Sequence, residues 1–228
     1  MTFATLAALN TAITGCTRCP RLVAYRAQVA RDKRRAFQDE AYWGRPLPGF
    51  GDPGARVLVV GLAPAAHGGN RTGRMFTGDR SGDFLYAALY RAGFANQPTS
   101  AGRGDGLQLA GAYIGASARC APPDNKPLPE ELANCRPYLV EELRLLARLQ
   151  VIVALGRIAL DNTLLALAAR GVPIPRPRPR FGHGAEYALG PYTVIASYHP
   201  SQRNTQTGLL TADMFDAIWA RARMSPPP

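Results

Sequence analysis

The four cysteines of the chain form two pairs whose spacing suits a thiolate-bound inorganic group. Cys16 and Cys19 enclose two residues, whereas Cys120 and Cys135 lie much later and enclose 14. Four thiolates hold either a tetrahedral zinc ion or a four-iron, four-sulfur cluster. Zinc ribbons usually carry two C-x2-C pairs, so the wide second pair favours the cluster. Zinc and a redox-active C-x2-C pair remain alternatives.

A loop rich in glycine and hydrogen-bond donors follows an apolar run at 57–61. Its G-x4-G-R pattern at 68–74 is similar in outline to a P-loop, but the Lys and Ser/Thr that bind triphosphates are absent. The loop also holds one aromatic ring, Phe76, and one acid, Asp79. Capping of the next helix by Asp79 or Ser81 is the structural alternative to a role in catalysis. The donors of the loop are His67, Asn70, Arg71 and Arg74.

A second polar loop leaves another apolar run at 194–198. It carries His199, one of only three histidines in the chain. A lone histidine is more often structural than catalytic, but this one follows a strand that is expected to be buried. Four polar residues that suit contacts to phosphate and to a DNA groove come next: Ser201, Gln202, Arg203 and Asn204.

Alternating buried strands and helices must position these loops. Short apolar runs predict strands at 57–61, 112–118, 151–155 and 194–198, and amphipathic patterns predict helices at 5–14, 20–37, 84–91, from 129, 158–169 and 210–223. Residues 43–54 and 62–82 are predicted to be loops. This order is typical of a three-layer α/β/α sandwich around a mostly parallel sheet, in which sites form at the carboxyl ends of strands. We expect one domain over 1–223 and a disordered tail over 224–228.

The charge of the chain predicts an anionic partner. Of its 228 residues, 27 are Lys or Arg against 16 Asp or Glu, which gives a net charge of +11. Only two of the basic residues are lysines, and arginine suits phosphate because its planar guanidinium donates paired hydrogen bonds. Nucleic acid is therefore the first expectation. Residues 174–180 (IPRPRPR) are predicted to be an extended basic segment, either a solvated connector or a DNA contact.

The hydrophobic runs exclude a membrane-spanning protein. The longest one, at 57–66, is far shorter than the ~20 residues of a spanning helix, and the N-terminus lacks the basic start of a signal peptide. We therefore expect a cytoplasmic protein whose thiols stay reduced, which favours cysteine ligands over disulfides.

Four long segments resemble the family-five (B-type) uracil-DNA glycosylases. They are GLAPAAHGGNRTGR-x-FTGD at 61–79, RCAPPDNKP-x-PEEL at 119–132, VALGRIAL at 153–160 and ASYHPSQRNTQTG at 196–208. The resemblance implies a single α/β/α glycosylase domain. This domain is expected to be a monomer that removes uracil from single- and double-stranded DNA without cutting the backbone. It also implies activity on hypoxanthine and some modified pyrimidines. The cluster it implies is a four-iron, four-sulfur group on the four cysteines.

The resemblance also assigns roles within the site. Asp79 is expected to be the catalytic acid and His199 the histidine at the uracil edge. The residues expected to bind the base are Phe76, which stacks on it, Asn125, which reads it, Gly61 and Ala63. The residues expected to contact DNA are His67, Asn70, Arg71, Arg74, Ser201, Gln202, Arg203 and Asn204.

The chain departs from other branches of the superfamily at two places. Leu62 and Ala63 are apolar where other branches carry an acidic or amide side chain, which leaves Asp79 as the available acid. Ala116 and Ser117 replace an asparagine, so base reading falls to Asn125. The roomier apolar pocket makes purine substrates an alternative to uracil. The other alternative is a non-catalytic module, with iron–sulfur or zinc, that binds damaged DNA.

Overall fold

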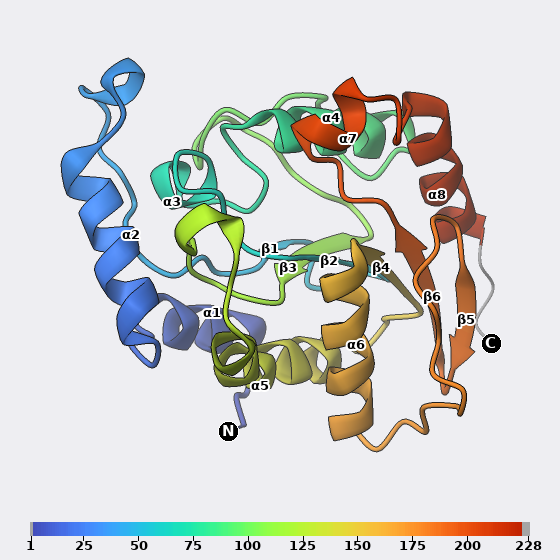
Figure 1. Ribbon diagram of the computed structural model, residues 1–228. Helices are drawn as coiled ribbons and strands as arrows, with labels where there is room; N and C mark the ends of the chain where they lie inside the picture. The colour runs from blue at the N-terminus through green and yellow to red at the C-terminus, as the bar shows by residue number, and fades with distance from the viewer. Residues whose placement is uncertain (1, 225–228) are drawn as a thin grey trace.

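A six-stranded sheet forms the centre of the computed structural model, which describes residues 2–224 (Figure 1). Its strand order is β1-β3-β2-β4-β6-β5, and the four inner strands run parallel. The edge strands β1 and β5 are antiparallel to their neighbours. The strands are β1 (Phe50–Gly51), β2 (Val57–Gly61), β3 (Ala112–Ala116), β4 (Val151–Leu155), β5 (Glu186–Leu189) and β6 (Tyr192–Ser197).

The inner strands are uniformly apolar because both faces of the sheet are covered by helices. On β2, Leu58 and Val60 pack with α1 (Leu6–Thr14), α5 (Pro129–Leu145) and α6 (Arg157–Ala169). Val57 and Val59 point the other way, into a cluster with α4 (Arg80–Arg91) and α8 (Ala212–Met224). Figure 1 shows these two groups of helices on opposite sides of the sheet. The three-layer α/β/α prediction is confirmed.

The remaining elements lie in segments that join the layers. The helix predicted over 20–37 is α2 (Pro20–Asp32), which ends at Lys33 with a φ of 51° and is followed by the turn η1 (Arg35–Phe37). Short helices α3 (Gly69–Thr72) and α7 (Gln202–Gln206) lie within the two polar loops, and the turn η2 (Pro123–Asn125) precedes α5.

Several sequence-based boundaries were wrong. Residues 43–54 are not all loop, because β1 pairs with β3, and the strand β5 was not predicted. The helix α4 starts at Arg80, four residues earlier than expected, because Asp79 caps it. Met224, placed in the tail, is the last residue of α8. The rest of the predicted tail, 225–228, lies outside the described residues. Within 2–224, no helix is long and apolar enough to cross a membrane.

Candidate active site

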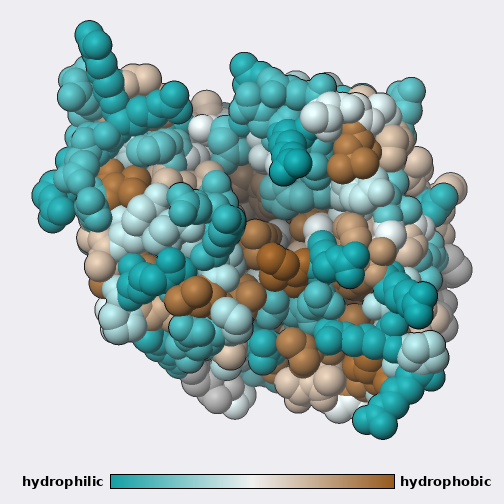
Figure 2. Space-filling model, in the orientation of Figure 1, coloured by the Kyte–Doolittle hydropathy of each residue, from teal (hydrophilic) through white to brown (hydrophobic). Residues whose placement is uncertain are grey.

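A pocket of about 450 Å³ opens where the carboxyl ends of β2, β3 and β6 meet. Figure 2 shows the molecule hollowed near the middle of this face, between hydrophilic rims. Parallel strands bring their carboxyl ends to one edge, so loops far apart in sequence converge there. The pocket is lined by Gly61, Leu62, Ala63, Pro64, Ala65, Met75, Phe76, Asp79, Arg80, Ser81, Ala116, Asn125, His199, Ser201, Gln202 and Arg203.

The ring of Phe76 forms one wall of the pocket and depends on two glycines. A Cβ atom at Gly61 would lie 2.8 Å from two carbons of the ring, so only glycine lets the ring rest against the end of β2. A Cβ atom at Gly82 would clash with the Phe76 carbonyl oxygen. Phe76 has a φ of 50°, an unusual backbone conformation for a bulky residue. Its ring centroid lies 5.8 Å from that of His199, with 32° between the planes.

The carboxyl group of Asp79 has two environments. Its Oδ1 accepts a hydrogen bond of 3.0 Å from the Gly82 amide, which makes Asp79 the N-cap of α4. Its Oδ2 packs over Gly68, where a Cβ atom would clash with it. Burial raises the pKa of Asp79, and the amides of Ser81 and Gly82 oppose that rise in part. Asp79 is therefore both the predicted helix cap and an acid facing the pocket.

His199 reaches the pocket directly after β6. Its carbonyl accepts a hydrogen bond of 2.9 Å from Nδ2 of Asn204, which fixes the start of the loop. Its Cβ lies 3.6 Å from where a side chain at Gly156 would begin, so the loop after β4 packs beside it. Burial lowers the pKa of His199 to about 4. The lowered pKa favours the neutral imidazole at physiological pH.

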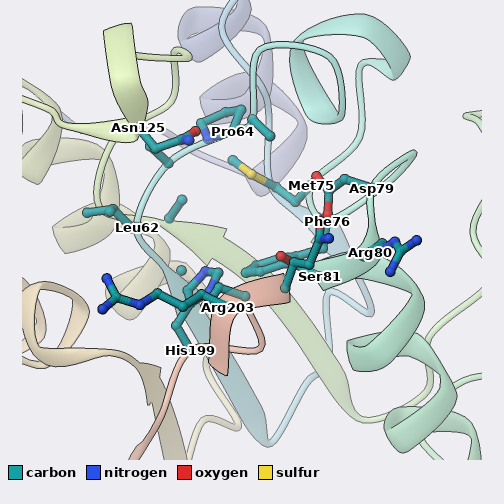
Figure 3. Close-up of a pocket in the computed structure, with 16 residues that line it drawn as sticks. Leu62, Pro64, Met75, Phe76, Asp79, Arg80, Ser81, Asn125, His199 and Arg203 are labelled. Carbon is teal, nitrogen blue, oxygen red and sulfur yellow. The ribbon is translucent and has the colours of Figure 1, made fainter. Parts of the chain in front are cut away.

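Asn125 approaches the pocket from the segment between β3 and α5. It ends the turn η2, where Asp124 and Asn125 both have positive φ values, 53° and 57°. The backbone N–H of Asn125 donates to the Pro122 carbonyl at 3.2 Å, and this hydrogen bond closes the turn. Figure 3 shows the side chain of Asn125 across the pocket from His199. A ligand in the pocket thus has the side-chain carboxamide of Asn125 on one side and the imidazole of His199 on the other.

A family model for the uracil DNA glycosylase superfamily matches residues 48–223, which include all of these pocket residues. The chain belongs to this superfamily. A type-5 uracil-DNA glycosylase of Thermus thermophilus is 52% identical over 212 residues, 92% of this chain and 94% of the relative. One of Mycobacterium tuberculosis is 52% identical over 217 residues, 94% and 80% of the two chains. One of Pyrobaculum aerophilum is 46% identical over 210 residues, 92% and 88% of the two chains.

The rim of this glycosylase-type pocket carries only some of the predicted DNA contacts. Ser201 caps α7 because its hydroxyl oxygen accepts a hydrogen bond of 3.3 Å from the backbone amide of Asn204. Gln202 and Arg203 are exposed at the pocket mouth. Asn204 instead holds the His199 carbonyl. Contact of Ser201, Gln202 and Arg203 with DNA stays a prediction, and Asn204 supports the loop.

Two of the predicted DNA contacts are wrong for this superfamily member because the side chains are buried. Asn70 has no exposed surface, and its Nδ2 donates to the Arg26 carbonyl at 3.3 Å. Arg74 is 4% exposed and is held inside the protein. Sequence alone does not tell an inward-facing donor from an outward-facing one in a glycine-rich loop.

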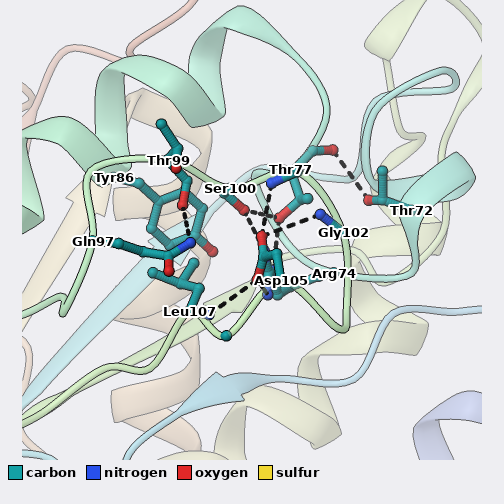
Figure 4. Close-up of polar contacts among 12 residues, drawn as sticks. Thr72, Arg74, Thr77, Tyr86, Gln97, Thr99, Ser100, Gly102, Asp105 and Leu107 are labelled. Atoms are coloured by element: carbon teal, nitrogen blue, oxygen red, sulfur yellow. Dashed lines mark hydrogen bonds and ion pairs between the residues drawn. The ribbon is translucent and has the colours of Figure 1, made fainter.

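Arg74 belongs to a buried network that the sequence did not indicate (Figure 4). Its guanidinium donates two hydrogen bonds to Asp105, at 2.8 and 2.5 Å, and others to Ser100 and Thr77. Tyr86 donates to the Met75 carbonyl at 2.8 Å. The network thus anchors the backbone at 74–77, which leads directly to Phe76 and Asp79. The sequence gives little indication of this network, because Asp105 lies in a glycine-rich segment 31 residues after Arg74.

His67 and Arg71 brace the same glycosylase loop from outside. The Nδ1 of His67 lies 3.0 Å from the Tyr42 hydroxyl, and Arg71 donates to the His67 carbonyl at 2.8 Å. Arg71 also pairs with Glu40 and donates to the Gly78 carbonyl at 3.1 Å. Neither residue lines the pocket. Their contact with DNA stays a prediction.

The four cysteines converge as the spacing predicted. All of them are free and line one small cavity between α2, the end of β3 and α5. Two buried arginines lie beside it: Arg119 lines the cavity, and Arg26 donates to the Cys16 carbonyl at 3.3 Å. Within the described residues, the Nε and Nη1 atoms of both arginines have no hydrogen-bond partner. Arg119 pairs through its Nη2 with the buried carboxylate of Glu142. The remaining unsatisfied guanidinium N–H groups beside four sulfurs suit a group that carries negative charge.

A single zinc ion would set a definite spacing between the four sulfurs. Zinc–sulfur bonds of about 2.3 Å would bring four tetrahedral sulfurs to about 3.8 Å from one another. In the described part of the chain, no three Cys, His, Asp or Glu side chains are arranged to hold one ion.

Proposed function

We propose that the protein is a monofunctional DNA glycosylase that hydrolyses the N-glycosidic bond of uracil in DNA and leaves the backbone intact. One observation carries the proposal: Phe76, Asp79, Asn125 and His199, from three separate segments, line a single pocket of about 450 Å³. The type-5 uracil-DNA glycosylases that match nearly the whole chain support the same activity. Apolar Leu62, Ala63 and Ala116 in the lining leave space for a purine, so hypoxanthine is included.

Binding begins with the flipping of the damaged nucleotide out of the DNA stack, which costs a few kcal/mol and is easiest for mispaired bases. In the pocket, the Phe76 ring stacks on the base. The Asn125 amide both donates and accepts, which matches the carbonyl and N3–H of uracil. DNA is the partner, and the excess of arginine favours its phosphates.

Bond cleavage develops positive charge on the sugar and negative charge on the departing base. Asp79, ionised, stabilises the sugar cation and orients the attacking water. Neutral His199 donates a hydrogen bond to the base as its negative charge grows, a preorganised stabilisation that requires no proton transfer. The raised pKa of Asp79 makes its carboxylate a stronger base than an exposed aspartate.

The direct test uses oligonucleotides that carry one uracil, one hypoxanthine or neither. Strand breaks at uracil that appear only after hot alkali are expected, because a monofunctional enzyme leaves an abasic site with an intact backbone. Breaks without alkali would show a lyase instead. Tight binding without breaks at any base would overturn the proposal and favour a module that only binds damaged DNA.

We also propose that Cys16, Cys19, Cys120 and Cys135 hold a four-iron, four-sulfur cluster. The shared cavity and the unsatisfied N–H groups of the two buried guanidiniums beside it support the proposal. Such a cluster supplies four iron–thiolate bonds and one-electron redox chemistry. Here those bonds would tie the N-terminal segment to β3 and α5. The anaerobically purified protein is expected to be yellow-brown with four irons and four sulfides per chain, and Cys135→Ser to lose the colour. Colourless protein with one zinc would refute the cluster.

A further inference from the structure

A basic and aromatic surface borders the pocket on the side away from Asn125. We call it the arginine–aromatic strip and define it as Arg157, Arg180, Phe181, His183 and Tyr198. It joins the pocket directly, because Tyr198 precedes His199 and the Gly156 amide donates to the Ser197 carbonyl at 2.8 Å. Figure 2 shows a small hydrophilic patch, with hydrophobic surface beside it, over the end of α6 that lies next to the hollow. Part of the strip follows the PRPRPR segment, which the proposed active site does not use.

Ring contacts hold the strip in place. The rings of His183 and Tyr198 stack with centroids 5.0 Å apart, and the ring of Phe181 lies 6.0 Å from that of Tyr198. The Tyr198 amide donates to Nδ1 of His183 at 3.2 Å. The Arg157 guanidinium lies 5.7 Å from the Phe181 ring centroid. Three segments of the chain are thereby fixed side by side, so the surface does not have to be ordered when a ligand binds.

The positive charge of the strip is poorly compensated. Nearby, Arg178 is paired with Asp161 at 3.6 Å and donates to its carbonyl at 2.9 Å, and Arg221 donates to the Gly184 carbonyl at 3.0 Å. Arg157 and Arg180 are exposed, and within residues 2–224 their guanidiniums make no ion pair or hydrogen bond. Exposed, unpaired guanidiniums beside aromatic rings are the combination that binds nucleic acid strands.

We propose that the arginine–aromatic strip binds the phosphates of the DNA strand that flanks the flipped nucleotide. The inference rests on the proposed function, since it assumes that the pocket holds a base still joined to its strand. A strand that leaves the pocket past His199 meets Tyr198 first and then Arg157 and Arg180. Their planar guanidiniums suit phosphate oxygens, and the rigid rings offer faces or edges to neighbouring bases.

The test compares two double variants of equal charge. Arg157→Ala with Arg180→Ala removes the unpaired guanidiniums of the strip. Arg148→Ala with Arg170→Ala removes two exposed arginines near the opposite end of the strands, one before β4 and one after α6. The dissociation constant for an undamaged single-stranded 20-mer is measured over a range of salt concentrations, and thermal melting shows that each variant is folded.

The strip variant is expected to bind about tenfold more weakly near 0.1 M salt, with a salt slope shallower by about 1.4, because each phosphate contact on single strands contributes about 0.7. The matched control should stay close to wild type. Equal binding by the two variants would overturn the proposal, because only net charge would then matter. The single variants Arg180→Glu and Arg180→Ala give a second check. Reversal of the charge by glutamate must weaken DNA binding more than its removal by alanine.

Excision of uracil by the wild-type chain is measured in parallel. If the wild type leaves uracil in place while the strip variant still binds weakly, the proposed function fails and the strip stands as a DNA-binding surface. If the wild type excises uracil and the strip variant binds DNA as the control does, only the strip fails.

Discussion

The carboxyl group of Asp79 lies directly over Gly68. A Cβ atom at Gly68 would stand 3.0 Å from Cγ of Asp79 and closer still to Oδ2. Gly68 precedes α3 and lies eleven residues before the acid, so the loop folds back on itself to bring the two together. The absence of a side chain at 68 therefore sets where the acid can sit in the pocket.

Replacement of Gly68 by alanine is expected to displace the carboxylate and slow uracil excision by about 100-fold, since an error of about 1 Å in a catalytic group has that effect. The melting temperature should fall modestly, because a displaced carboxylate also weakens the cap of α4, which is worth about 1 kcal/mol. Gly104→Ala is the matched control, as a Cβ atom there would meet nothing within 4 Å. Unchanged excision by Gly68→Ala would show that the position of Asp79 over Gly68 is not required.

Asp79→Asn is expected to stabilise the fold at neutral pH. Asparagine keeps the oxygen that caps α4 but does not bury a charge, whereas alanine would lose the cap at a cost of about 1 kcal/mol. Because burial raises the pKa of Asp79, the folded wild type loses stability as the pH rises through the interval between the unfolded and folded pKa values. The stability gain of the variant over wild type should thus be absent at pH 3 and present at pH 7. Melting curves that run parallel at both pH values would contradict this.

Asp105→Ala is expected to destabilise the protein by about 3 kcal/mol, because it leaves the buried Arg74 guanidinium without its carboxylate. The guanidinium of Arg74 holds the pKa of Asp105 well below its usual range. The stabilisation is therefore present above the unfolded pKa of the acid and is lost as the pH falls through its folded pKa. Urea denaturation measures the effect.

The control for the buried pair is the exposed pair of Arg91 and Asp216, whose atoms lie 2.7 Å apart. Asp216→Ala should cost no more than about 1 kcal/mol, as surface ion pairs contribute little. Equal losses for the two aspartates would mean that burial of the Arg74–Asp105 pair adds nothing to stability.

His199 is expected to stay neutral from pH 5 upwards. Burial lowers its pKa to about 4, so protonation below that value is the only change of charge it undergoes in the acid range. Proton NMR of the three histidines, assigned with His67→Gln and His183→Gln, measures this directly. A titration of His199 near 6.5 would instead indicate a charged imidazole under physiological conditions.

The inner strands of the sheet could be predicted from sequence because burial on both faces leaves a continuous apolar run, as at Val57–Gly61. The edge strands could not. Phe50–Gly51 is only two residues long, and Glu186–Leu189 is mostly exposed. Each of them forms a strand because it pairs with its neighbour in the sheet, and neither shows an apolar pattern that predicts a strand. The early start of α4 was not predicted because its first turn, Arg80 to Asp83, is polar and carries a glycine, so that it depends on the Asp79 cap.

The site was predictable where a distinctive residue type lay in a loop that leaves a buried strand, as for Asp79 in the loop after β2 and His199 close after β6. It was not predictable where partners come from distant segments. The orientation of Arg74 depends on Asp105 and Ser100, and the burial of Asn70 depends on the Arg26 carbonyl. No spacing rule links such residues, since the loop that carries the partner has no regular pattern.

Single-turnover excision tests the central claim most directly. The wild type and Asp79→Asn are each mixed, in molar excess, with single-stranded DNA that contains one uracil. The release of free uracil and the binding of the DNA are both measured. We predict rapid release of uracil by the wild type, a rate lower by about 100-fold or more in the variant and equal binding by both, since a positioned acid–base group contributes at least that factor. Equal rates of release would contradict the assignment of Asp79, and no release by the wild type would contradict glycosylase activity itself.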